Sequence, residues 1–251
     1  MVYNVLIVYA WERMEMALKR EAKQPFHCEN RYHRGETGRP VRWKRIRYAA
    51  LGDSFTFGYS GKKTEGIASY PRLIAEITGC RYTLLCTPGA AWAKRDGVTI
   101  PTMTDYARHI SGDYDIITVY AGVNDRPSLC PNRAAGEVAW GTLGDFEETT
   151  FYGAIGFTLK ALRLKYPYIP ILVLIDTGNR EKDEALQAAA EYFRMPALRL
   201  DKMGMNPPWL GEELRAQGKA PYYSDLLHPS REGHRMIARA VLGEMKKYIN
   251  V

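Results

Sequence analysis

Short apolar runs alternate with amphipathic segments along the chain from residue 45 onward. The runs at 116–121 and 171–175 are almost continuously apolar, which is typical of parallel strands covered on both faces. We expect the strand that ends at Cys86 to be buried as well, with Cys80 and Cys86 as reduced, core-like thiols. The pattern predicts strands over Ile46–Leu51, Tyr82–Cys86, Ile116–Ala121, Ile171–Ile175 and Ala197–Leu200.

Helices are predicted between these strands. Asp145 and Glu148 have the spacing of a capping box, which predicts a helix start there, and that helix ends before Pro167. The other predicted helices are Tyr70–Thr78, which ends at Gly79, Glu181–Phe193 and Arg231–Tyr248. Regular alternation of strand and helix predicts an α/β fold, a three-layer α/β/α sandwich with about five parallel strands. Ligands of such open sheets bind beyond the carboxyl ends of the strands.

Residues 1–44 precede this regular pattern and are predicted to be a basic extension to the domain formed by residues 45–251. Within the extension, Val2–Ala10 resembles a strand and Glu12–Lys23 has helix-forming composition. The formal net charge is +7, and residues 11–47 hold eleven Lys or Arg against five acidic residues. A basic arm of this kind can contact nucleic acid or an anionic surface. We expect a solvated extension with no nucleic-acid partner, because the interleaved aromatics form no known binding module.

The composition is that of a globular protein with one large domain. The chain has 251 residues, 46% of them hydrophobic and 25% charged, and no apolar run reaches eighteen residues. Without a recognisable membrane span or signal peptide, a cytoplasmic location is expected. His27, Cys28 and His33 lack a fourth ligand at zinc spacing, so neither a metal nor a cofactor is expected. The oligomeric state does not follow from the sequence.

A nucleophile and a base are suggested by two motifs far apart in the sequence. Ser54 follows the first regular strand in Gly52-Asp53-Ser54, where it serves either as a helix N-cap or as a nucleophile. His228 is the candidate general base, and Asp225, three residues earlier, would orient its ring. The alternative is an exposed loop pair before a helix that begins at Pro229-Ser230. His234 falls within that helix and is expected to be a surface or packing residue.

Three candidate donors could bind the negative charge that develops on an ester oxygen during attack. They are the backbone N–H groups of Ser54 and Gly89 and the side-chain amide of Asn124. Gly89 allows close approach of the backbone to a substrate, although Pro88-Gly89 also fits a plain turn. Asp53 and Asp125 are expected to be structural carboxylates that accept hydrogen bonds in their loops.

Taken together, these motifs resemble those of the SGNH (GDSL) hydrolases, a family of esterases and lipases. The resemblance rests on residues 52–58, Gly89, residues 122–125 and residues 225–234, and it extends over roughly residues 45–250. It implies a flavodoxin-like fold, a catalytic triad of Ser54, Asp225 and His228, an oxyanion hole of Ser54, Gly89 and Asn124, and no metal. Two departures are the missing Asn before Gly89 and the basic extension.

The predicted activity is therefore hydrolysis of short acyl or acetyl esters through an acyl-enzyme, with a small-molecule or carbohydrate carrier. The alternatives are a lysophospholipase or thioesterase of the same family, and a non-catalytic binding or scaffold protein that uses the basic arm. The loops expected to frame the pocket are 90–97, 126–144 and 202–224. Their aromatic residues either line the substrate site or pack the loops; they are Trp92, Trp140, Trp209, Tyr222 and Tyr223.

Overall fold

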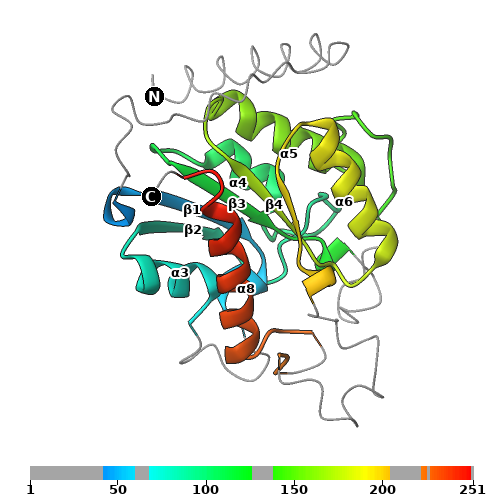
Figure 1. The fold of residues 1–251 in the computed structure, drawn as a ribbon. Coiled ribbons are helices and arrows are strands. Elements are labelled where there is room, and N and C mark those ends of the chain that lie inside the picture. The colour runs from blue at the N-terminus through cyan, green and yellow to red at the C-terminus, as the bar shows by residue number, and fades with distance from the viewer. Residues whose placement is uncertain (1–41, 60–67, 126–137, 204–221, 225–226, 250–251) are drawn as a thin grey trace.

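The computed structural model describes residues 42–59, 68–125, 138–203, 222–224 and 227–249. Residues 1–41 of the extension, Asp225 and Trp209 lie outside these residues, so the expectations for them concern parts of the chain that the structure does not describe. A five-stranded, all-parallel sheet forms the centre of the fold, in the order β2-β1-β3-β4-β5 (Figure 1). Its strands are β1 (Arg47–Gly52), β2 (Arg81–Cys86), β3 (Ile116–Tyr120), β4 (Ile171–Ile175) and β5 (Ala197–Arg199). The predicted α/β sandwich of five parallel strands is confirmed.

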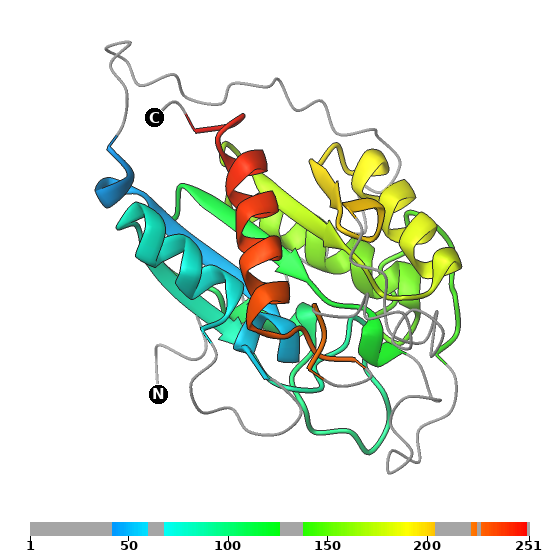
Figure 2. The same cartoon turned by 60° about the horizontal axis from the view of Figure 1, so that its bottom comes forward.

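Helices cover both faces of the sheet. Helices α3 (Tyr70–Thr78) and α8 (Arg231–Met245) pack together on one face, and α4 (Met103–His109), α5 (Phe151–Lys165) and α6 (Arg180–Tyr192) lie on the other (Figures 1 and 2). The short elements are α2 (Ser54–Phe57) and the 3₁₀ turns η1 (Trp43–Arg45), η2 (Val123–Asp125) and η3 (Asp201–Met203). None of the described helices is long and apolar enough to cross a membrane.

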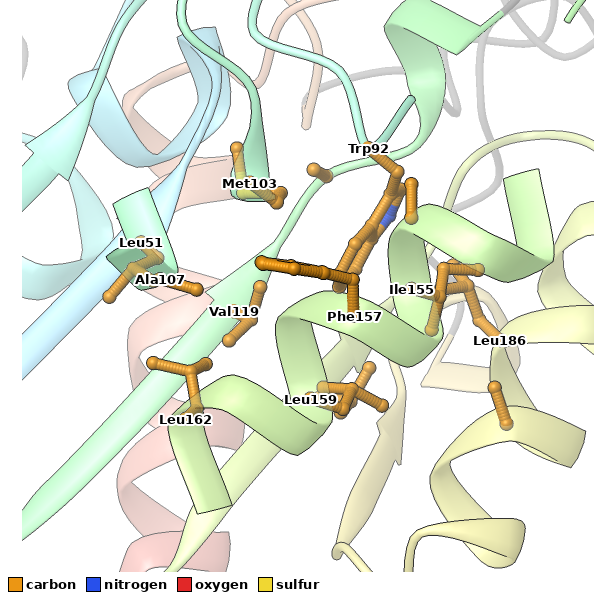
Figure 3. Packing of buried hydrophobic residues seen from close by; sticks show 14 of the residues in the cluster. Leu51, Trp92, Met103, Ala107, Val119, Ile155, Phe157, Leu159, Leu162 and Leu186 are labelled. Carbon is orange, nitrogen blue, oxygen red and sulfur yellow. The ribbon is translucent and has the colours of Figure 1, made fainter. Parts of the chain in front are cut away.

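Two hydrophobic clusters lie on opposite faces of the sheet, because successive side chains of a strand point to opposite sides. In β4, Val173 packs with the α4–α5–α6 side, whereas Leu172 and Leu174 pack with α3 and α8. Figure 3 shows the first cluster, in which Trp92 and the residues of α5 meet the sheet. The continuous apolar runs of β3 and β4 are fully buried, as their patterns predicted.

Three details differ from the sequence predictions. Strand β2 is an edge strand with residues 81–84 exposed, since only β1 pairs with it among the described strands. Helix α5 begins at Phe151, capped by Thr150, so the predicted capping box at Asp145 is wrong. Glu148 pairs instead with Arg108 of α4, a helix that the sequence analysis missed. Cys80 and Cys86 are free thiols; Cys80 is buried, and Cys86 is half-buried.

Candidate active site

The carboxyl ends of β1 and β3 meet where the strand order reverses, which is where ligands bind in sheets of this order. Ser54 follows β1 and is the first residue of α2, whose N-cap is Asp53. Asp53 Oδ1 accepts a hydrogen bond from the Phe55 amide at 2.9 Å. A side chain on Gly52 has no room, because a Cβ there would lie 2.0 Å from Thr56 Oγ1 and 2.7 Å from the Tyr120 carbonyl oxygen. The Gly-Asp-Ser sequence thus fixes a tight turn that presents Ser54.

The imidazole of His228 lies next to Ser54, although the two residues stand near opposite ends of the domain in the sequence. His228 Nε2 lies 3.2 Å from Ser54 Oγ, across 174 positions of sequence. Its ring packs edge-on against Tyr59, with centroids 4.6 Å apart, and against Phe55, with centroids 5.9 Å apart. Ser54 is buried and His228 is half-buried. The pair therefore has the geometry in which an imidazole can take the proton of a serine hydroxyl.

The segment before α8 positions His228. The Ser224 amide donates a hydrogen bond to the His228 carbonyl oxygen at 2.9 Å, and the Ser230 amide donates one to the Tyr222 carbonyl oxygen at 2.8 Å. Ser230 then caps α8 by accepting a hydrogen bond from the Gly233 amide. His234 is fully buried in α8, which makes it a packing residue; burial and then the neighbouring His228 lower its pKa to about 4.

Asn124 lies in the turn that follows β3, in contact with the serine loop. Its Nδ2 donates hydrogen bonds to Asp53 Oδ2 at 3.2 Å and to the Ala90 carbonyl oxygen at 2.9 Å. Both amide hydrogens are thus engaged, so donation to a substrate oxygen requires one of these bonds to be exchanged. Gly89 lies on the adjoining loop with φ +88°, a conformation that favours glycine. The structure brings Ser54, Asn124 and the Gly89 loop to one edge of the sheet.

Carboxylates and cations hold the Asn124 turn in place. Asp125 is fully buried, and its two carboxylate oxygens accept hydrogen bonds from the Trp92 and Ala93 amides, both at 3.0 Å. Arg95 donates to the Asn124 carbonyl oxygen, and Lys182 Nζ donates to the Asp125 carbonyl oxygen at 2.5 Å. Hydrogen bonds therefore hold both the Asp125 carboxylate and the main-chain carbonyl groups of this turn. They fix the position of the turn and, with it, the orientation of the Asn124 amide.

Burial sets the protonation of the two loop carboxylates. Burial raises the pKa of Asp53 to about 7; the charge of Asp125 adds to this shift, and the Phe55 amide opposes it. Burial also raises the pKa of Asp125, against the hydrogen bonds from Ala93 and Trp92. Asp53 and Asp125 accept hydrogen bonds in their loops, as the sequence predicted.

Sequence reasoning missed Arg95 and Lys182. A basic residue in the loop after β2 carries no distinguishing signal, but Lys182 lies in the first turn of α6, where the helix dipole disfavours a cation. The unfavourable position of Lys182 in the helix therefore indicates that its ammonium group has a partner outside the helix, which is the Asp125 carbonyl oxygen. Of the two roles expected for Trp92, the structure supports packing, because its side chain is fully buried among residues of α5 and the sheet (Figure 3).

The model of the GDSL-like Lipase/Acylhydrolase family matches residues 50–236, well over half of the sequence. The chain belongs to this family of hydrolases.

A solved structure of a protein from Lactobacillus plantarum is 26% identical, with a TM-score of 0.62, covering 81% of this chain and 97% of the other. A protein from Bacteroides ovatus classed as a GDSL-like lipase is 16% identical, with a TM-score of 0.58, covering 81% and 99%. A carbohydrate esterase is 14% identical, with a TM-score of 0.51, covering 84% and 70%. The latter two show the shared fold alone. Comparison with curated proteins gave no match.

Proposed function

We propose that the protein is a serine esterase that hydrolyses short acyl or acetyl esters through an acyl-enzyme intermediate. The observation that carries this proposal is the 3.2 Å approach of His228 Nε2 to Ser54 Oγ at the carboxyl edge of the sheet. Family membership supports hydrolase chemistry, and the fixed turn at Asn124 supports charge stabilisation beside the serine.

In the first half of the proposed reaction, Ser54 Oγ attacks the ester carbonyl carbon and its proton passes to His228 Nε2. The carbonyl oxygen becomes an oxyanion, which the Ser54 and Gly89 amides and the Asn124 side chain would stabilise. Collapse breaks the bond to the alcohol, which leaves with the proton from His228. Water then attacks the acyl-enzyme while His228 takes its proton. Collapse breaks the bond between the acyl carbon and Ser54 Oγ, the carboxylic acid is released, and His228 returns the proton to Ser54. Asp225 is proposed to orient the imidazole.

Hydrolysis of p-nitrophenyl acetate tests this proposal. Ser54→Ala and His228→Ala are expected to lower kcat by about 10⁴-fold or more, because the two side chains act as one unit. Ser111→Ala and His109→Ala serve as matched controls, since these exposed residues lie away from the Ser54–His228 pair, and they are expected to retain activity. Equal turnover by the wild-type protein and the Ser54→Ala variant would contradict the proposal.

We propose short acyl groups because the polar side chains of Asp53 and Asn124 lie at the serine loop. A series of p-nitrophenyl esters from acetate to palmitate, measured with the same variants, is expected to show its highest kcat/KM at the acetyl or propionyl end. An optimum at long chains, with no acetyl release, would instead support a lipase.

A further inference from the structure

A cavity of about 350 Å³ adjoins the Gly89 loop, and neither Ser54 nor His228 lines it. Its walls come from residues 89–102 of the loop between β2 and α4, together with Asp105 of α4 and Thr149. The volume falls within the range of small-molecule sites. The first of the three loops expected to frame a substrate pocket thus forms a cavity beside the candidate oxyanion donors.

Two basic and two acidic side chains line this cavity, and one of the basic residues is paired with carboxylates of the protein. Lys94 Nζ lies 3.3 Å from Asp105 Oδ1 and 3.0 Å from Glu148 Oε2, so these groups satisfy one another. Arg95 and Asp96 also line the cavity, and neither forms an ion pair within the described residues. Arg95 uses one donor on the Asn124 carbonyl oxygen, which leaves further N–H groups available for a ligand.

These groups select the chemistry of a ligand. An alkyl chain placed here would desolvate charged side chains without replacing their hydrogen bonds, which is costly. An anion or a cation gains little, because two basic and two acidic side chains share the cavity. A hydroxyl group both donates and accepts hydrogen bonds, so neighbouring hydroxyls match the Arg95 donors and the Asp96 acceptors.

The cavity and the candidate oxyanion hole are parts of one hydrogen-bonded structure. The Trp92 and Ala93 amides, which belong to the cavity loop, bind the Asp125 carboxylate. Asn124 binds the Ala90 carbonyl oxygen, and Arg95 binds the Asn124 carbonyl oxygen. A ligand held by Arg95 and Asp96 would therefore be fixed in position relative to Asn124 and Gly89.

We propose that this cavity binds the polyhydroxylated carrier of the ester, a sugar whose acetyl group is presented to Ser54. The inference rests on the proposed esterase function and names the substrate class of that site. Arg95 and Asp96 determine specificity for the carrier, and Arg95 also positions the Asn124 turn.

The test compares two substrates in the same variants. The kcat/KM for a monoacetylated methyl glucoside or methyl xyloside, divided by that for p-nitrophenyl acetate, measures carrier recognition. Asp96→Ala is expected to lower this ratio about 10-fold, the size of a lost hydrogen bond to a charged group. Thr99→Trp, which places a large ring at the exposed cavity wall, is expected to lower it about 100-fold. Asp113→Ala is the control, because Asp113 is exposed and pairs with Arg47, the first residue of β1.

Binding gives a second readout that does not depend on catalysis. We expect the Ser54→Ala variant to bind unacetylated methyl glycoside, as observed by saturation-transfer NMR. In the double variant that carries Ser54→Ala and Thr99→Trp, this signal is expected to disappear. An unchanged substrate ratio in both cavity variants, or undiminished glycoside binding with Trp at position 99, would overturn the sugar subsite. Either result leaves the proposed esterase function unaffected. Turnover that does not depend on Ser54 would instead reject the esterase function, and the glycoside-binding experiment would then test the sugar subsite by itself.

Discussion

The two halves of the candidate site are built differently. The oxyanion half consists of turns at the ends of β1 and β3, and buried carboxylates and cations fasten the Asn124 turn to the cavity loop. The base half is a short segment before α8, and its described contacts include two backbone hydrogen bonds, a bond from the Ser224 hydroxyl to the His228 carbonyl oxygen, and aromatic contacts with the His228 ring. The comparison indicates that the scaffold fixes the turn that carries the candidate oxyanion donor Asn124, whose amide must still exchange a hydrogen bond to donate to a substrate, whereas a loop positions the candidate base.

The largest effect expected from breaking the oxyanion half alone is on the rate. Asn124→Ala removes one of the proposed oxyanion donors, and kcat is expected to fall about 10²–10³-fold while KM changes less. Gln187→Ala provides a matched control, because the Gln187 amide bonds Glu191 on the exposed side of α6, and the variant is expected to retain its kcat. A kcat within a factor of three of wild type for Asn124→Ala would show that Asn124 does not stabilise the oxyanion.

The Asp125 carboxylate tests the rigidity of the same half. Asp125→Ala leaves the Trp92 and Ala93 amides buried without their acceptor, which is expected to lower the free energy of unfolding by about 2–4 kcal/mol. Urea denaturation measures this change. Asp125→Asn keeps one carbonyl acceptor and is expected to cost less. Equal stability of the wild type and the Asp125→Ala variant would contradict the account of this turn.

The pH dependence of stability distinguishes Asp53 from an ordinary surface carboxylate. Because burial raises its pKa from 3.8 to about 7, folding takes up a proton between these pH values. The contribution of Asp53 to the free energy of unfolding therefore falls as pH rises through this window, by about 1.4 kcal/mol per pH unit, and is constant above it. Urea denaturation from pH 4.5 to 8 is expected to show this slope reduced in Asp53→Asn. Parallel curves for both proteins would rule the shift out.

The smallest effect is expected in the base half. Ser230→Ala removes the N-cap of α8 and is expected to lower the free energy of unfolding by about 1 kcal/mol. Because the same segment positions His228, kcat for p-nitrophenyl acetate is expected to fall a few-fold as well. A loss of stability as large as that of Asp125→Ala would mean that the two halves are equally fastened.

Much of the fold follows from local patterns. Strands β3 and β4 were predictable because near-continuous apolar runs suit a sheet covered on both faces. Helix α4 was missed because its seven residues are mixed in character, and its capping box of Thr102 and Asp105 escaped notice. The start of α5 was misplaced because Asp145 and Glu148 have capping-box spacing, whereas tertiary contacts with Lys94 and Arg108 take up Glu148.

The candidate site was predictable to a different degree. Ser54, Asn124 and His228 stand in recognisable motifs, and the structure places them together, but their catalytic roles stay predictions. Arg95 and Lys182 could not be assigned from sequence, because their partners are backbone carbonyl groups, which leave no trace in residue identity. Likewise, the cavity of about 350 Å³ depends on how the loop of residues 89–102 packs against α4.

Covalent labelling of Ser54 tests the central claim most directly. After reaction with a fluorophosphonate, intact-mass and peptide fragmentation spectra of the wild type and of Ser111→Ala are expected to show one adduct, on Ser54. His228→Ala is expected to react far more slowly, and Ser54→Ala not at all. An adduct on another residue, or labelling of Ser54 at the same rate without His228, would contradict a serine activated by that imidazole.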